Sequence, residues 1–99
     1  MFTASIVLYK ENNSVLKKAV DSFLNTPIKK RLYLIDNSPT DILRNQYINN
    51  DITYIFVGEN IGFGAAHNLV LEKIKNQSDF HLILNPDVFF APSVIPNLI

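Results

Sequence analysis

The sequence contains no cysteine, which excludes disulfide bonds and every metal site that depends on thiolate ligands. Glycine is scarce as well, and the three glycines stand within seven residues, at positions 58, 62 and 64. Backbone freedom is therefore concentrated in one stretch, GENIGFGAAHN at 58–68. No apolar run approaches the roughly 20 residues of a membrane helix, and the apolar N-terminal segment lacks the basic lead of a signal peptide. We expect a cytoplasmic protein, or the cytoplasmic part of a larger one.

An excess of either charge sign is also missing, because nine basic residues balance nine acidic ones. This balance argues against a nucleic-acid partner held by bulk electrostatics. Two basic spots, at 17–18 and 29–31, are interpreted as a solvated helix face and a loop, with contact to a membrane surface as the less favoured alternative. The 99 residues suit a single domain, 1–99. The segment 91–99 begins like a helix and stops on an apolar residue, so we expect a longer natural protein.

Hydrophobic patterning predicts four strands that alternate with helices. The expected strands are residues 2–9, 31–36, 52–58 and 80–85. The expected helices run from a cap at Asn13–Ser14 to near Pro27, over residues 40–48, and onward from about Ala65. Such an order calls for a parallel sheet with right-handed crossovers. We predict a Rossmann-like three-layer α/β/α fold with strand order 3-2-1-4, and ligands outside the carboxyl ends of the strands.

Each of the four predicted strands ends in polar or glycine-rich sequence. The segments concerned are Tyr9–Asn12, Asp36–Ser38, the stretch 58–68, and Asn85–Asp87. Each has a structural interpretation: Tyr9 suits a partly buried core position, and Asp36 suits an Asx turn or a helix cap. Their convergence on one edge of the sheet favours a functional interpretation.

The glycine stretch does not match the common phosphate-binding fingerprints. Its Gly62-x-Gly64-x-x-His67 lacks a third glycine and follows the third strand, and no Gly-Lys-Ser/Thr occurs. One interpretation is a loop that needs positive φ at Gly62 or Gly64 before a helix. The other is a wall where backbone and a helix N-terminus approach an anionic ligand. We expect His67 to be solvent-facing or at the core edge, and Phe63 to plug the loop.

Asp87 follows Pro86, which lacks an N–H and belongs at the end of a strand. A carboxylate on such a stiff turn suits Mg²⁺ or Mn²⁺, which take one or two protein carboxylates and complete their shell with phosphate oxygens and water. A turn or capping role for Asp87 is the alternative.

Taken together, IVLYKENN, LYLIDNSP, GENIGFGAAHN and LILNPDV resemble the N-terminal, donor-binding half of family 2 inverting glycosyltransferases of the GT-A fold. The motifs span about residues 3–90, in the order of that family. They are most similar to a rhamnosyltransferase-like branch that builds bacterial cell-surface polysaccharides.

The resemblance implies roles for the strand ends. Tyr9 would line the nucleotide base, and Asp36 would accept a hydrogen bond from the imide N–H of uracil or thymine. Asn60, Gly62 and Gly64 would shape the pocket of a UDP- or dTDP-linked sugar.

For the diphosphate, the resemblance implies a divalent cation on Asp87. Asn85 stands where many relatives carry a further aspartate, and His67 stands where the family commonly has arginine. Both would belong to the donor site.

The catalytic base of the family is a carboxylate that this resemblance places beyond residue 99. The acceptor would be a glycan or a lipid-linked sugar, with peripheral association of the full-length protein at the inner face of the membrane. We therefore expect the chain alone to bind donor without catalysing transfer. The alternatives are a non-catalytic nucleotide-binding module and, less favoured, a nucleotidyltransferase, whose glycine loop would follow the first strand.

Overall fold

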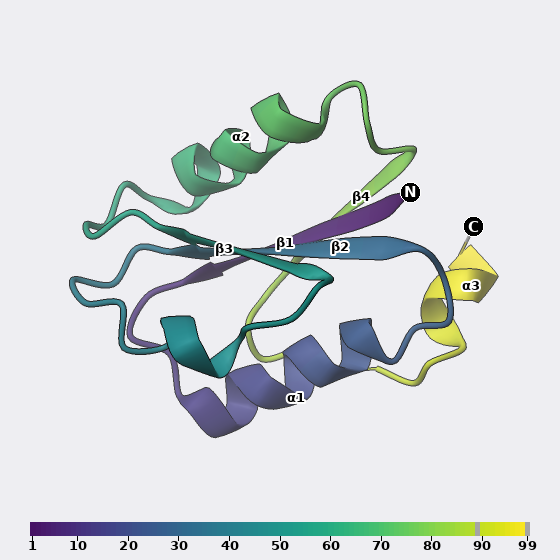
Figure 1. Ribbon diagram of the computed structural model, residues 1–99, viewed down its shortest axis with the longest axis horizontal. Helices are drawn as coiled ribbons and strands as arrows, with labels where there is room; N and C mark the ends of the chain where they lie inside the picture. Colours follow the sequence, from purple (N-terminus) through teal and green to yellow (C-terminus); the bar gives the residue numbers. More distant parts are fainter. Residues whose placement is uncertain (89, 99) are drawn as a thin grey trace.

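The computed structural model describes residues 1–88 and 90–98. Its centre is a parallel sheet with the order β3-β2-β1-β4, as predicted. The strands are β1 (Phe2–Leu8), β2 (Lys30–Asp36), β3 (Ile52–Phe56) and β4 (Phe80–Leu84). Their carboxyl ends share one edge of the sheet, on the left in Figure 1.

Helices cover both faces of the sheet, which gives the predicted three layers (Figure 1). Helix α1 (Asn13–Leu24) packs on one face, where Leu16, Val20 and Phe23 meet alternate residues of β1 and β2 in a buried core. Helix α2 (Phe63–Ile74) packs on the other face in a second, smaller cluster. The short helix α3 (Val94–Leu98) lies at the opposite end of the molecule from the strand carboxyl ends (Figure 1). Among the described residues, no helix is long and apolar enough to cross a membrane.

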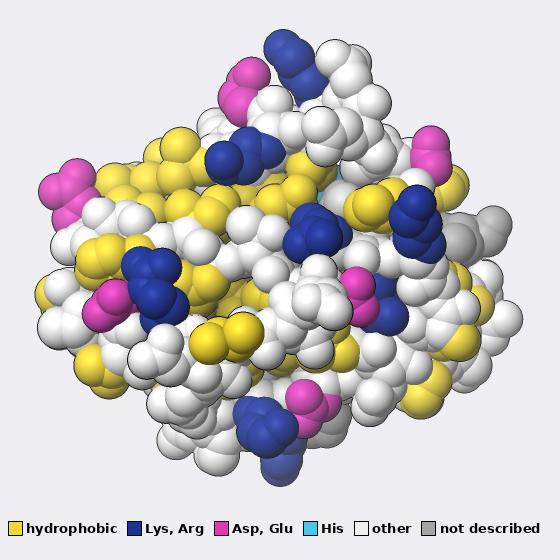
Figure 2. Space-filling model, in the orientation of Figure 1, with side chains coloured by type: hydrophobic (Ala, Val, Ile, Leu, Met, Phe, Trp, Pro, Cys, Tyr) yellow, Lys and Arg dark blue, Asp and Glu magenta, His cyan; other side chains and the backbone are white. Residues whose placement is uncertain are grey.

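The surface drawn in Figure 2 carries its hydrophobic side chains mainly over β3 and the adjacent side of α2. Lysine, arginine, aspartate and glutamate side chains are interleaved over the same face rather than sorted by sign. The face therefore presents no broad patch of a single charge.

The start of α1 differs from the prediction by one residue. Asn12, not Asn13, is the N-cap, with extended backbone angles and a side-chain oxygen that accepts from the amides of Ser14 (2.9 Å) and Val15 (3.4 Å). The carbonyl of Asn12 also accepts the first helical bond, from Leu16. A cap must combine these features, and Asn12 alone does.

The predicted helix over 40–48 is wrong, because only one 3₁₀ turn forms there, η1 (Arg44–Gln46). Ile42 and Ile48 are 76% and 80% exposed, so only Leu43 and Tyr47 bury apolar surface from this segment. A stripe of two buried residues supports a single turn rather than an amphipathic helix.

Two glycines with positive φ, Gly58 and Gly62, determine the path of the chain between β3 and α2. Gly58 has φ 82°, which ends β3 two residues earlier than predicted. Gly62 has φ 87° and ψ 161° and is the N-cap of α2, which begins at Phe63 rather than near Ala65. The prediction of positive φ is thus confirmed at Gly62, whereas Gly64 lies inside the helix.

Exchanging these two glycines for alanine should give stability changes of opposite sign. Gly62→Ala forces a side chain into a region of backbone space open almost only to glycine, and should cost about 1–3 kcal/mol. Gly64→Ala meets no atom within 4 Å of the new Cβ and should stabilise α2 by roughly 0.5–1 kcal/mol. Urea unfolding of both variants measures the difference, and equal effects would contradict the backbone assignment.

Candidate functional site

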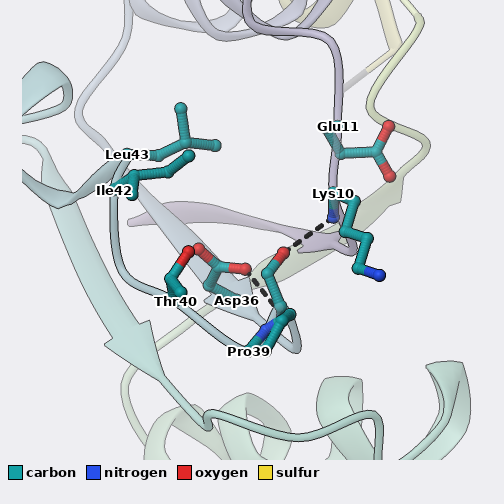
Figure 3. A pocket seen from close by; sticks show the side chains of 8 residues that line it. Lys10, Glu11, Asp36, Pro39, Thr40, Ile42 and Leu43 are labelled. Atoms are coloured by element: carbon teal, nitrogen blue, oxygen red, sulfur yellow. Dashed lines mark hydrogen bonds between the residues drawn. The ribbon is translucent and has the colours of Figure 1, made fainter.

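A cavity of about 280 Å³ opens beside the carboxyl ends of β1 and β2. One wall comes from the residues after β1, and the rest from the end of β2 and the loop that follows (Figure 3). The lining residues are Lys10, Glu11, Asp36, Ser38, Pro39, Thr40, Ile42 and Leu43.

Asp36 is the buried carboxylate of this cavity, with 1% of its surface exposed. Its Oδ1 accepts from the amide of Ser38 at 2.9 Å, and its Oδ2 accepts from the hydroxyl of Tyr54. The Asx-turn interpretation of Asp36 therefore holds, and it coexists with a place in the cavity lining. Because each carboxylate oxygen can accept more than one hydrogen bond, Asp36 keeps capacity for a ligand.

The turn after β1 is fixed by a contact to the turn after β2. Lys10 adopts a positive φ of 53°, rare for a residue with a side chain. Its amide donates to the Ser38 hydroxyl at 2.7 Å, as the dashed line in Figure 3 shows. A strained residue held by a specific partner is common at binding sites. The hydrogen bond between Lys10 and Ser38 thus fixes the position of one cavity wall.

Tyr9 does not line this cavity, although the sequence singled it out. Its side chain is 45% exposed, and the Lys10 ammonium lies 5.4 Å from the centre of its ring. Its neighbours Lys10 and Glu11 take the place in the wall. All three residues stand at the strand end, and the left-handed turn at Lys10 brings Lys10 and Glu11, but not Tyr9, into the cavity wall.

Tyr54, which sequence reasoning missed, reaches Asp36 from β3. Burial, followed by the hydrogen bond and the negative charge of Asp36, raises the pKa of the Tyr54 phenol above its ordinary value, while the nearby Arg44 lowers it. The phenol thus remains protonated and donates at neutral pH. The available signal was strand alternation, which puts Tyr54 on the α1 face together with Leu34 and Asp36.

The glycine stretch lies at the same edge of the sheet but outside the lining of the Asp36 cavity. Asn60 is exposed, and its side-chain oxygen accepts from the Gly62 amide at 3.0 Å. Gly62 and Gly64 are exposed where α2 begins. Asn37 links the two regions, because its side-chain amide donates to the Gly62 carbonyl at 3.5 Å.

His67 is buried rather than solvent-facing or at the core edge, with 2% of its surface exposed. Its Nδ1 lies 2.6 Å from the Ser5 hydroxyl, which lies 2.9 Å from His81 Nε2. His81 Nδ1 lies 2.7 Å from Thr3 Oγ1, and Thr3 Oγ1 lies 2.7 Å from Ser78 Oγ. Burial lowers the pKa of both histidines, and the pKa of His81 is lowered further by His67. We call these five residues the histidine chain.

Phe63 packs on His67 rather than sealing the loop. The two rings meet edge to face with centroids 4.3 Å apart, and Phe63 is 54% exposed. The predicted plug is therefore a partly open cover over the buried imidazole.

Asn85 and Asp87 are exposed on the turn after β4, outside the Asp36 cavity. The turn is closed by the Val88 amide, which donates to the Asn85 carbonyl at 3.2 Å. Within residues 1–88 and 90–98, no group of three or more histidine, cysteine, aspartate or glutamate side chains could hold a metal ion. Asp87 can thus contribute one carboxylate to a shared ion, and no more.

An open parallel sheet with helices on both faces and a cavity at the carboxyl ends of its strands defines an α/β domain of the doubly wound class. The sequence profile of Glycosyl transferase family 2 matches residues 3–99, so the chain belongs to that family. No curated protein matches the sequence significantly.

Solved structures that share the fold include two of S. aureus TarS. The crystal structure of S. aureus TarS 1-349 superimposes with a TM-score of 0.79 at 15% identity, covering 98% of this chain and 30% of that one. The crystal structure of S. aureus TarS gives 0.78 at 14% identity, covering 98% and 18%. The chain therefore spans less than a third of either TarS chain.

Proposed function

We propose that this chain supplies the donor site of a glycosyltransferase that moves a sugar from a UDP- or dTDP-linked donor to a glycan or lipid-linked acceptor. One observation carries the proposal: in a family 2 chain, a buried carboxylate, Asp36, lines a cavity of about 280 Å³ at the strand carboxyl ends. We place the protein in the rhamnosyltransferase-like branch, acting in bacterial surface polysaccharide synthesis at the cytoplasmic face of the membrane.

In this proposal the pyrimidine base enters the Asp36 cavity. Its imide N–H donates to the carboxylate, and the base faces contact the apolar side chains of Pro39, Ile42 and Leu43. A hydrogen bond to a charged, desolvated acceptor contributes about 1.5–3 kcal/mol, enough to select one base. Inverting transfer also needs a general base to take the acceptor proton. We assign that base and the acceptor site to sequence outside these 99 residues.

The lone carboxylate of Asp87 fits a divalent ion only in a shared shell. Mg²⁺ and Mn²⁺ commonly take one or two carboxylates and complete their coordination with nucleotide phosphate oxygens and water. An exposed aspartate on a turn stiffened by Pro86 provides such a ligand at this edge of the sheet. An ion bound there would neutralise the departing diphosphate as a Lewis acid. Asp87 is accordingly the residue we assign to the metal.

Calorimetric titration of the chain with UDP, dTDP and GDP, with and without Mn²⁺, tests the proposal. We expect UDP and dTDP to bind more tightly than GDP, and Mn²⁺ to increase their affinity about tenfold through the added charge-assisted contact. In Asp87→Ala the gain from Mn²⁺ should disappear. The control Glu72→Ala removes an exposed carboxylate on α2 and should keep the gain.

Each outcome has a separate meaning. A wild-type chain that binds neither UDP nor dTDP, or binds GDP equally well, contradicts the donor site. A full Mn²⁺ effect in Asp87→Ala contradicts only the assignment of the metal to Asp87.

A further inference from the structure

Tyr54 contacts Asp36 from outside the cavity. Its hydroxyl donates to Asp36 Oδ2, whereas the Ser38 amide donates to Oδ1 at 2.9 Å. Tyr54 is not among the lining residues, so the phenol holds the carboxylate from behind the ligand space. With a donor on each oxygen, the plane of the carboxylate is fixed.

The ring of Tyr54 is itself held in place by the loop that forms the cavity. The guanidinium of Arg44 lies 5.0 Å from the centre of the Tyr54 ring and 5.9 Å from that of Phe56. Arg44 Nε also bonds Asp41 Oδ2 at 3.0 Å. Arg44 belongs to η1, directly after the lining residues Ile42 and Leu43. This stacking ties the cavity loop to β3 across the phenol.

We infer that Tyr54 is a positioning residue that sets the base preference of the site through Asp36. This inference rests on the proposed donor site. A carboxylate whose two oxygens each accept from a donor of the protein presents its remaining lone pairs to the ligand. Uracil and thymine present an N–H at the imide position, whereas cytosine presents a lone pair there. A desolvated acceptor that meets another acceptor is left unsatisfied, which is costly.

Tyr54→Phe removes the donor and keeps the ring, so it separates positioning from packing. We expect the preference for UDP over CDP to fall about tenfold, since the released carboxylate loses one charge-assisted hydrogen bond and its fixed plane. The matched control is Tyr47→Phe, which also deletes a hydroxyl from the α1-face core, one that donates to Asn13 at 2.6 Å. That control should keep the preference within about twofold. A purely structural role of Tyr54 would lower stability and leave the preference unchanged.

A second measurement uses the wild-type chain and so does not depend on how the variant folds. With tyrosine labelled at ¹³Cζ, the Tyr54 signal should shift more on addition of UDP than on addition of CDP, because uracil donates an N–H to the shared carboxylate where cytosine presents a lone pair. An unchanged preference in Tyr54→Phe, or a Tyr54 signal that ignores UDP, overturns the inference. A wild-type chain without preference for UDP over CDP contradicts the donor site itself, which is a different failure.

Discussion

Asparagine in place of Asp36 should weaken UDP binding by about 10- to 150-fold, the equivalent of 1.5–3 kcal/mol for a hydrogen bond to a charged group. The new amide nitrogen points a donor at the imide N–H of uracil, where the carboxylate offered an acceptor. The fold should survive, because asparagine keeps an oxygen for the Ser38 amide, which lies 2.9 Å from Asp36 Oδ1.

The same variant should treat cytosine differently. An amide donor can bond the cytosine lone pair, so CDP should bind to this variant at least as tightly as it binds to the wild-type chain. The preference for UDP over CDP should therefore shrink or reverse. Asp21→Asn is the control, because Asp21 lies on α1, pairs with Lys17 and is outside the cavity lining. Calorimetry with both nucleotides measures the effect. Equal losses for UDP and CDP would mean that Asp36 supports the fold without reading the base.

The histidine chain predicts a second large effect, and its hydrogen-bond direction can be derived. The carbonyl of Phe80 only accepts, and Ser78 Oγ lies 2.6 Å from it, so the Ser78 hydroxyl donates there. The Thr3 hydroxyl donates to Ser78 Oγ or to the Phe80 carbonyl, 3.2 Å away. In both cases Thr3 Oγ1 accepts from His81 Nδ1–H. His81 Nε2 is consequently a lone pair, free to accept from Ser5.

The direction continues to His67. The Ser5 hydroxyl donates to His81, so it accepts from His67 Nδ1–H. His67 Nε2 is left as a lone pair, buried and without a hydrogen-bond partner among the described residues. The reverse direction would bury an N–H without an acceptor, which folded proteins avoid more strictly than an unused acceptor. Both imidazoles are therefore neutral in the folded chain.

Acidification should destabilise the fold through these two groups. The pKa values of His67 and His81 in the folded chain lie below the ordinary 6.5. Below about pH 6.5 the unfolded chain therefore binds more protons than the folded chain. Stability is then complete above about pH 6.5 and falls as the pH is lowered toward the folded-state pKa values. Each proton taken up only on unfolding changes the free energy of unfolding by about 1.4 kcal/mol per pH unit.

Urea unfolding between pH 7.5 and 5 measures this dependence above the range in which carboxylates dominate. His67→Asn keeps a donor near the position of Nδ1 and removes the titration, so its slope should be smaller by up to about 1.4 kcal/mol per pH unit. Asn68→Ala, an exposed change in the same helical turn, should keep the wild-type slope. A slope unaltered by His67→Asn would show that His67 does not titrate on unfolding.

The strand order and the edge that carries the site followed from the sequence because they depend on local patterns. Alternating strands and helices admit few parallel topologies. The scarcity of glycine likewise marked Gly62, where the backbone requires it. Asp36 was predictable for the same reason, since a polar residue that ends a buried strand must lie at the carboxyl edge of the sheet.

The remainder depended on contacts between distant segments. The histidine chain exists because parallel pairing puts Thr3 opposite His81 across β1 and β4, and because α2 lays His67 over Ser5. The contact of Tyr54 with Asp36 likewise needs the register of β2 and β3. No local sequence pattern predicts either strand register, so the histidine chain and the Tyr54–Asp36 contact could not be predicted.

The central claim is that a pyrimidine nucleotide binds in the Asp36 cavity, and an NMR titration of the ¹⁵N-labelled chain with UDP tests it most directly. We predict saturable shifts of the amides of Lys10, Ser38 and Leu43, which surround the cavity, with little change at the far ends of the strands. Shifts that leave these three amides untouched, or no saturable shifts at all, would contradict the account.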